Sequence, residues 1–257
     1  MIAIDKLSYA SGLRKKNGTV KFAYAMITLL IIVFSRSFRT AIIVLVLNAF
    51  LTMKKGGVSS RRYLHFMAVP LIFLVLSTLA ILFHVSREPM DLFALPLGSR
   101  YLTGSREGLQ YALQLILTAL ASVSCLYFLS MTTPMPDILN VLHRLRCPRL
   151  LGELMLLIYR YIFVLLDTAG RIRISQNSRL GNKDYGTALQ SFGALGSVLM
   201  IRAIGRSKAL YDAMEARCYD GTIQVLSEEN PPEKKDIVLI ILFECFLLAV
   251  GFGRSFL

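Results

Sequence analysis

The chain has 257 residues, 55% of them hydrophobic, and a mean hydropathy of +0.58. Several apolar runs approach the roughly 20 residues that span a bilayer, so the composition predicts an integral membrane protein rather than a soluble domain. Lysine and arginine outnumber aspartate and glutamate by 29 to 16. In a membrane protein such an excess usually lies in cytoplasmic loops, so nucleic-acid binding is a poor explanation for it.

The N-terminus, the cysteines and the histidines exclude three further features. The first residues carry Asp5 and several basic residues but no small-residue cleavage site, which argues against a removable signal peptide. The cysteines have no paired spacing, so neither a disulfide framework nor a zinc site is predicted; they are Cys125, Cys147, Cys218 and Cys245. The histidines lie far apart, so no metal site is expected within this chain; they are His65, His84 and His143.

Five apolar segments are predicted to span the membrane. They are residues 21–34, 40–53, 64–84, 108–131 and 236–252. The first two are short and are separated only by residues 35–39, so they are expected to form a tight hairpin that is tilted or partly interfacial.

A sixth apolar stretch, residues 150–166, contains Glu153 and Arg160 and ends at Asp167. Because charges make a lipid-facing span expensive, this stretch is predicted to be a helix lying against protein.

The basic residues between these spans predict the orientation of the chain. Residues 1–21 carry five, residues 54–62 carry four and residues 132–235 carry fourteen, whereas the alternate loops carry two and three. The positive-inside rule therefore predicts a cytoplasmic N-terminus and an outward C-terminus. Three parts are expected: an N-terminal membrane domain of four apolar helices (residues 1–131), a cytoplasmic coupling domain (132–235) and a C-terminal transmembrane helix (236–257).

The segment 132–235 is predicted to form one short helix and two long ones. The short helix begins near Pro134, has its apolar residues at helical spacing and stops at Pro148, so it is expected to lie in the membrane interface. The long helices cover residues 150–181 and 185–219, and each is roughly 50 Å long at 1.5 Å per residue. This exceeds the thickness of the bilayer core, so the two must cross or lie obliquely. The many small residues of the second long helix are expected to allow close backbone approach at the crossing; they are Gly193, Ala194, Gly196, Ala203, Gly205, Ala209 and Ala213.

Both long helices end on an arginine beside small residues. The first ends on Ser178-Arg179-Leu180-Gly181, and the second ends on Ala216-Arg217-Cys218, with Gly221 following. An arginine before a glycine is also an ordinary helix end, because a cation favours the negative end of the helix dipole and glycine takes the left-handed cap. The recurrence at two successive helices favours the docking of a paired soluble partner.

Charged residues inside the helices favour structural roles. Glu153, Arg160 and Asp167 are spaced seven apart on roughly one face, and Asp167 precedes Arg171 by four residues. This spacing predicts an ion-pair ladder rather than a transport path. Glu244 lies in the middle of the last span, where an ion pathway is the alternative. A single carboxylate without an obvious partner favours an internal hydrogen bond to a neighbouring helix.

In order and spacing, a series of motifs resembles one family over nearly the whole chain. The motifs are Ile4-Asp5-Lys6-Leu7 with Ser11 and Leu13, residues 103–109, residues 132–139, residues 159–166, and the two helix ends at 178–181 and 214–221. The chain resembles the transmembrane coupling (T) component of energy-coupling factor transporters, a branch of the ABC importers. Within these it is most similar to the cobalt-type CbiQ group.

This resemblance implies an all-α scaffold subunit in a prokaryotic plasma membrane. In the family, two coupling helices each end in an Ala-Arg-Gly-like motif that docks on one of two cytoplasmic ATPases, while a separate membrane subunit captures the substrate. By analogy the ATPase-docking residues are Ser178, Arg179 and Leu180 at one end and Ala216, Arg217 and Cys218 at the other. Ser178, Leu180 and Cys218 depart from the family pattern of Ala and Gly. The resemblance implies no metal or cofactor on this chain, ATP-Mg on the partner ATPases, and cobalt or nickel as substrate, with a vitamin left open.

Enzyme classes are disfavoured by missing motifs. The sequence contains neither a Gly-x-x-x-x-Gly-Lys-Ser/Thr phosphate loop nor a His-Glu-x-x-His motif. A lipid phosphotransferase is the alternative, but it would need Asp-Gly before Ala-Arg, whereas here Ala216-Arg217 precedes Asp220-Gly221 and no aspartate cluster follows. The permease half of a conventional ABC importer would show one coupling loop with a Glu-Ala-Ala motif.

Overall fold

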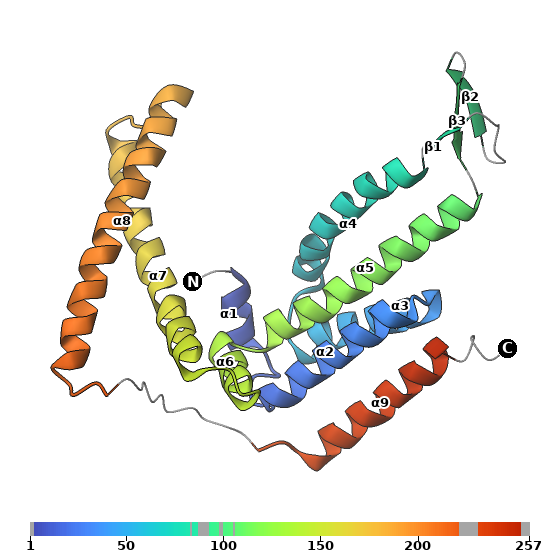
Figure 1. Ribbon diagram of the computed structural model, residues 1–257, viewed down its shortest axis with the longest axis horizontal. Helices are drawn as coiled ribbons and strands as arrows, with labels where there is room; N and C mark the ends of the chain where they lie inside the picture. The colour runs from blue at the N-terminus through green and yellow to red at the C-terminus, as the bar shows by residue number, and fades with distance from the viewer. Residues whose placement is uncertain are drawn as a thin grey trace. The chain divides into compact units, whose positions relative to one another are not determined.

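A computed structural model describes residues 3–82, 84–86, 93–97, 100–104, 106–220 and 231–252. The chain divides into two compact units. We name Ile2–Ile138 together with Glu228–Leu257 the membrane unit, and Leu139–Ser227 the hairpin unit. Both consist mainly of helices (Figure 1). The predicted all-α integral membrane protein is confirmed, whereas the predicted boundaries at residues 131 and 235 stay predictions.

The membrane unit contains six α-helices and a π-helical turn among its described residues. The helices are α1 (Ala3–Ala10), α2 (Gly18–Ser35), α3 (Phe38–Phe50), α4 (Ser60–Leu82), α5 (Arg106–Thr132) and α9 (Lys234–Phe252), and the π-turn is Leu51–Lys55. The first turns of α6 (Met135–Arg144) also belong to it. The predicted hairpin of the first two apolar segments is confirmed, because only Arg36 and Ser37 separate α2 from α3.

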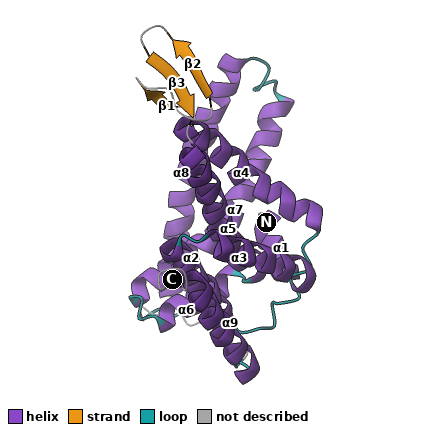
Figure 2. Ribbon diagram, turned by 90° about the vertical axis from the view of Figure 1, so that its right-hand side faces the viewer, coloured by secondary structure: helices purple, strands orange, loops and turns teal. Residues whose placement is uncertain are grey.

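Among the described residues between α4 and α5 are three short strands, where the sequence analysis predicted none. They are β1 (His84–Ser86), β2 (Phe93–Leu97) and β3 (Arg100–Gly104), and they form an antiparallel sheet in the order β1-β3-β2 (Figure 2). Val85 and Leu95 both align with Leu102 of the central strand. The third apolar segment was predicted to reach residue 84, but α4 ends at Leu82.

Among the residues that the structure describes, four helices are long and apolar enough to cross a membrane. They are Gly18–Ser35, Ser60–Leu79, Gly108–Thr132 and Tyr185–Glu215. The first three correspond to predicted spans. The other two predicted spans are helical, but α3 has only 13 residues, and α9 carries two lysines, Asp236 and Glu244. The fourth, Tyr185–Glu215, was expected to be a cytoplasmic helix.

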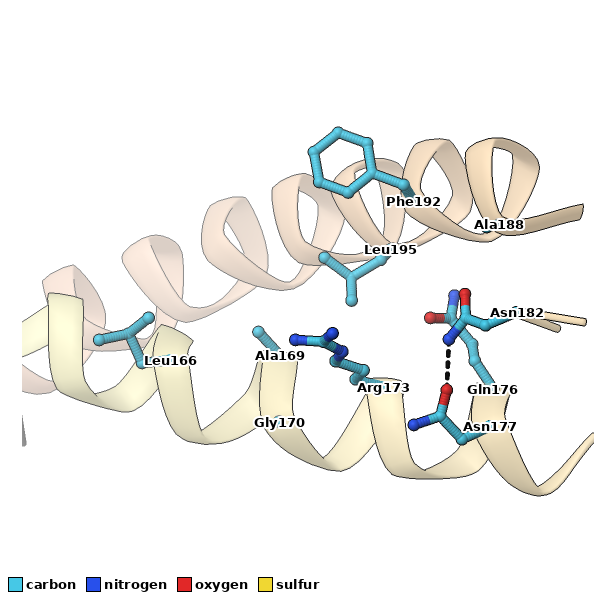
Figure 3. A pocket seen from close by; sticks show the side chains of 10 residues that line it. All are labelled: Leu166, Ala169, Gly170, Arg173, Gln176, Asn177, Asn182, Ala188, Phe192 and Leu195. Carbon is cyan, nitrogen blue, oxygen red and sulfur yellow. Dashed lines mark hydrogen bonds between the residues drawn. The ribbon is translucent and has the colours of Figure 1, made fainter. Parts of the chain in front are cut away.

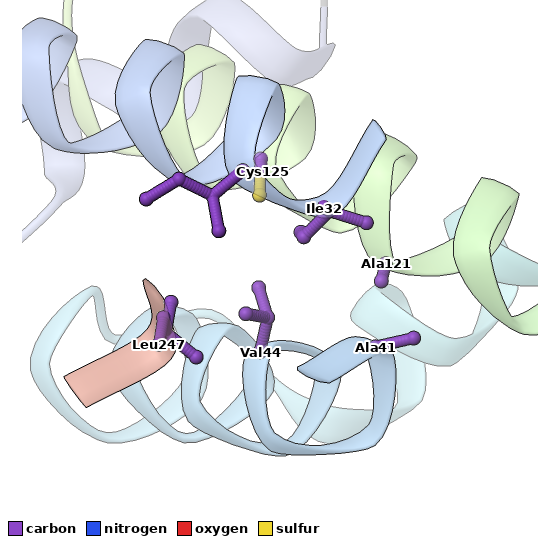
Figure 4. Close-up of a cluster of buried hydrophobic side chains, with 7 residues drawn as sticks. Ile32, Ala41, Val44, Ala121, Cys125 and Leu247 are labelled. Carbon is purple, nitrogen blue, oxygen red and sulfur yellow. The ribbon is translucent and has the colours of Figure 1, made fainter. Parts of the chain in front are cut away.

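The core of the membrane unit lies where α2, α3, α5 and α9 meet. α5 packs against α1, α2, α3 and α4, and α9 packs against α2 and α3. One buried cluster draws on all four of these core helices (Figure 4), namely Ile31, Ile32, Ala41, Val44, Ala121, Cys125 and Leu247. Ala41 of α3 and Ala121 of α5 are fully buried in this cluster, and such small side chains allow helix backbones to approach closely.

Buried polar side chains connect the same helices. Asn48 of α3 accepts a hydrogen bond from the Tyr24 hydroxyl at 2.8 Å, and its amide donates to Ser124 Oγ at 3.1 Å and Cys125 Sγ at 3.2 Å. Glu244 Oε1 lies 2.5 Å from the Thr28 hydroxyl, which confirms the predicted hydrogen bond between the last span and a neighbouring helix. Such bonds fix which faces of the helices meet, because a mismatched pairing would leave polar atoms buried without partners.

Lys21, near the start of α2, is buried and caps another helix. Its Nζ donates to the carbonyl oxygen of Thr132 at 2.9 Å and to that of Leu13 at 3.2 Å. Thr132 is the last residue of α5, so the ammonium group lies at the negative end of that helix dipole. The sequence analysis counted Lys21 only as an orienting charge.

Lys16 connects the segment before α2 to the start of α9. Its Nζ lies 2.9 Å from carboxylate oxygens of both Glu233 and Asp236. Hydrogen bonds to Asp236 and Glu233 raise the pKa of Lys16 above its ordinary value. The side chain is therefore charged at neutral pH and holds the entry to α9 against the N-terminal part of the chain.

The hairpin unit consists of the end of α6 and two long antiparallel helices, α7 (Arg149–Ser178) and α8 (Tyr185–Glu215), which cross in Figure 1. The short amphipathic helix predicted from Pro134 is confirmed as α6. No residue of α7 or α8 is buried. The predicted ion-pair ladder is confirmed in its step from Asp167 to Arg171, whose charged atoms lie 2.9 Å apart.

The glycines of α8 do not mediate close packing within this chain, contrary to the sequence analysis. A Cβ added at Gly193, Gly196 or Gly205 would meet no described atom within 4 Å. The reason is that the two helices contact each other through few side chains, which leaves these glycines on open surface.

Candidate functional site

The first predicted docking end, at the C-terminus of α7, is a Schellman motif. The amide of Leu180 donates to the carbonyl of Asn177 at 3.1 Å, and the amide of Gly181 donates to that of Gln176 at 2.8 Å. Leu180 has φ +56°, in the left-handed region. These two bonds and the left-handed residue define the motif. Arg179 is the residue immediately before the left-handed position.

The second predicted docking end, at the C-terminus of α8, repeats this backbone. The amide of Cys218 donates to the carbonyl of Glu215 at 2.9 Å, and the amide of Tyr219 donates to that of Met214 at 3.1 Å. Cys218 has φ +59°, so Arg217 again lies immediately before the left-handed residue. The two arginines therefore occupy equivalent backbone positions.

The end of α6 is also a Schellman motif, but its arginine occupies a different position in the motif. At the end of α6 the amide of Cys147 donates to the carbonyl of Leu142 at 3.1 Å, and Arg146 has φ +62°. There the arginine occupies the left-handed position itself, and Leu145 precedes it. The Schellman backbone is thus a common way to end a helix, whereas an arginine just before the left-handed residue distinguishes the ends of α7 and α8.

Leu180 and Cys218 stand where glycine is favoured. A left-handed conformation costs a residue with a Cβ about 1 kcal/mol more than glycine. The backbone nevertheless follows the path that a glycine would take. Leu180 and Cys218 therefore still take the left-handed position of the turn that follows each arginine.

All six predicted docking residues are exposed. Neither Arg179 nor Arg217 forms a salt bridge with any residue in the described ranges. The Ser178 hydroxyl donates back to the Ile174 carbonyl of its own helix at 3.0 Å, so it does not cover the arginine. Both guanidinium groups are available to an acidic partner.

Each end is tied to the opposite helix. At the α7 end, the Gln176 side chain donates to the carbonyl of Ser191 at 2.7 Å, and the Ser191 hydroxyl donates to the carbonyl of Gly181 at 2.7 Å. At the α8 end, the Tyr219 hydroxyl donates to Glu153 Oε2 at 3.0 Å. This bond to Glu153 raises the pKa of Tyr219 above its ordinary value. Sequence reasoning missed these contacts, because each joins residues that are distant in the chain.

The two ends lie at opposite ends of the hairpin. Glu153 and Gln176, which hold them, are about 35 Å apart along α7 at 1.5 Å per residue. The ends are thus well separated, as expected. Each end is therefore a separate surface on the hairpin unit.

A groove lies between α7 and α8 behind the first end (Figure 3). It has a volume of about 830 Å³ and is lined by Leu166, Ala169, Gly170, Arg173, Phe192 and Leu195, among others. Asn177 and Asn182 also line it, and the Asn182 side chain donates a hydrogen bond to that of Asn177. Its lining is mainly apolar, and within the described ranges no group of three or more His, Cys, Asp or Glu residues could hold a metal ion.

Replacing the left-handed residues by glycine is expected to stabilise the hairpin unit. Leu180→Gly and Cys218→Gly should each add about 0.5–1 kcal/mol, because glycine removes the left-handed strain. Thermal unfolding of the purified full-length variants measures the change. Gly181→Ala is the opposite control, because its Cβ would lie 2.7 Å from Ser191 Oγ and 3.0 Å from the Gln176 carbonyl oxygen. A loss of stability in both glycine variants would show that the present side chains make stabilising contacts.

The chain matches the cobalt transport protein (CbiQ) family over residues 10–227. An uncharacterized protein of Methanocaldococcus jannaschii is 32% identical over 97% of this chain and 92% of its own length. The cobalt transport protein CbiQ of Salmonella typhimurium is 32% identical over 64% of this chain and 73% of its own length. A putative fused cobalt transport protein CbiMQ of Methanocorpusculum labreanum is 28% identical over 97% of this chain, which spans 41% of the fused protein.

The apolar helices of the membrane unit and these matches define a multi-pass membrane protein of a transport class. The chain belongs to the CbiQ family of cobalt transport proteins. The family that the sequence motifs resemble is thereby confirmed.

Proposed function

We propose that this chain is the transmembrane coupling subunit of an energy-coupling factor importer for cobalt. In this role it transmits the movement of two cytoplasmic ATPases to a separate membrane subunit that captures the metal. The observation that carries the proposal is the repeated helix end, in which Arg179 and Arg217 occupy the same position of the same backbone motif. The names of the relatives support cobalt over nickel, and the fused CbiMQ relative supports a membrane partner.

The exposed arginines suit docking on an acidic groove. A guanidinium presents several donors in a rigid fork, matches a carboxylate with two hydrogen bonds, and is more weakly hydrated than an ammonium group. The small side chains of Ser178, Ala216 and Cys218 leave room around each arginine, and Leu180 adds an exposed apolar contact at one end. ATP-Mg belongs to the ATPases in this proposal, and the chain itself holds neither cofactor nor metal.

The long helices supply the mechanical connection. α7 has 30 residues and α8 has 31, so each is a rod of about 45 Å. When nucleotide binding draws two docked ATPases together, both ends of the hairpin follow, and the rods carry the displacement to the membrane subunit. The excess of basic residues in residues 132–235 supports a cytoplasmic position for the hairpin unit.

Reconstituted transport tests this function. We expect a bacterium that lacks cobalt uptake to accumulate radioactive cobalt when it expresses this chain together with two ATPases and a metal-capturing membrane subunit from the same organism. Omission of the chain should abolish accumulation, and the purified chain alone should hydrolyse no ATP. Cobalt accumulation without the ATPases, or phosphate transfer to lipid by the chain alone, would overturn the proposal.

A further inference from the structure

A second cleft, outside the helix ends, lies in the membrane unit between α1 and the first turns of α4. It has a volume of about 600 Å³. Lys6, Leu7 and Ala10 line it from α1, and Arg61, Arg62 and Phe66 line it from α4. Neither the family match nor the proposed coupling role assigns this cleft a ligand.

The charge of the cleft is strongly one-sided. Lys6, Arg61 and Arg62 are all exposed, and none of the three forms a salt bridge with any described residue. His65, on the same turn of α4, also faces the cleft, and its lining contains no acidic residue. Three cations that converge without a counter-charge attract an anion, because their mutual repulsion falls when the anion binds.

The position of the cleft at the start of an apolar span indicates which kind of anion it binds. Arg61 and Arg62 are the second and third residues of the apolar run Ser60–Leu79, which is long enough to span a membrane. The first turn of a span lies at the membrane surface, at the depth of the lipid phosphates. Leu7, Ala10 and Phe66 add an apolar wall to the cleft. Acyl chains can pack against this wall, whereas a small soluble anion gains nothing from it.

We propose that this cleft binds the headgroup of an anionic phospholipid. Arg61, Arg62 and Lys6 donate hydrogen bonds to the phosphate oxygens, and the apolar wall packs on the glycerol and the first acyl carbons. The bound lipid holds α1 against the start of α4. This site is independent of the docking of ATPases, so either proposal can fail without the other.

Lipid binding to the full-length chain in nanodiscs tests the site. We use phosphatidylglycerol with a quencher on its acyl chain, diluted into phosphatidylcholine, and follow a fluorophore attached to the N-terminus of the chain, which precedes α1 and the cleft-lining Lys6. The variant K6Q/R61Q/R62Q is expected to bind this lipid about a hundredfold more weakly than the wild-type chain. The matched control K15Q/K54Q/K55Q removes three exposed lysines from the same basic segments but none from the cleft, and it should stay within a few-fold of wild type.

Two further measurements distinguish specific lipid binding in the cleft from non-specific attraction by surface charge and from binding of free phosphate. Ala10→Phe fills the cleft without changing charge and should weaken phosphatidylglycerol binding at least tenfold. Inorganic phosphate added to phosphatidylcholine nanodiscs containing the unlabelled chain should not raise its thermal midpoint, whereas unlabelled phosphatidylglycerol should. Equal losses in the two triple variants, or an unchanged affinity in Ala10→Phe, would overturn the proposal. If free phosphate raised the thermal midpoint as much as phosphatidylglycerol, the cleft would bind a soluble anion, and the proposal would also be overturned.

Discussion

Reversal of both exposed arginines, Arg179→Glu with Arg217→Glu, is expected to abolish copurification of the ATPases while leaving the chain in the membrane. Neither arginine supports the fold, since both are exposed and neither forms a salt bridge with a described residue. A glutamate would face the partner's carboxylate, and removal of one member of a charged interfacial pair costs about 2–5 kcal/mol. Because neither end can then dock, binding should fall below detection. The ratio of ATPase to chain after affinity purification from membranes measures the effect.

Single reversals and a matched control sharpen this test. Each single variant should keep one docking end and recover about half of the ATPase, because the two ends are separate sites on one chain. Arg202→Glu with Arg206→Glu makes the same change of charge on exposed positions of α8, away from both ends, and should recover ATPase normally. Full recovery of ATPase with the double reversal at Arg179 and Arg217 would contradict docking through these arginines.

Replacement of Lys21 by glutamate is expected to prevent the membrane unit from folding stably. The wild-type lysine is only 5% exposed and donates to the last carbonyl of α5, whereas a glutamate would place an uncompensated negative charge beside that carbonyl. A buried charge without a partner, here the new glutamate, costs about 3–5 kcal/mol, and the helix dipole adds to the penalty. The yield of monodisperse protein after detergent extraction and its thermal midpoint both measure the effect.

The control for this prediction is an exposed lysine in the same basic segment. Lys15→Glu makes the same change of charge at an exposed position, so it should cost little in yield or thermal midpoint. If Lys21→Glu and Lys15→Glu behaved alike, Lys21 would act only as an orienting charge, and its hydrogen bonds to Thr132 and Leu13 would contribute nothing to stability.

Most of the helices, and the two helix ends that carry Arg179 and Arg217, could be predicted from the sequence. Apolar runs and proline stops are local signals, so they predicted α2, α4, α5 and the short α6. The two arginine ends were found because the same short pattern closes two successive helices. The hydrogen bond of Glu244 was expected on general grounds, since a carboxyl group within a span needs a partner.

Features that depend on contacts between distant residues, or on backbone conformation, could not be predicted from the sequence. The partner of Lys21 is the carbonyl at the end of α5, which only the fold brings near. The left-handed turns at Leu180 and Cys218 lack the glycine that normally signals them. The strands between α4 and α5 are too short to show a clear alternation. The glycines of α8 suggested a crossing point, but their surroundings are open.

The sparse contact between α7 and α8 gives the hairpin an uneven mechanical character. Along its own axis each helix resists compression through a continuous ladder of backbone hydrogen bonds. Between the helices no residue is buried, and the described hydrogen bonds are confined to Gln176, Gly181 and Ser191 near one end and to Glu153 and Tyr219 near the other. The crossing angle between α7 and α8 can therefore change at a small cost in free energy, while each helix keeps its length.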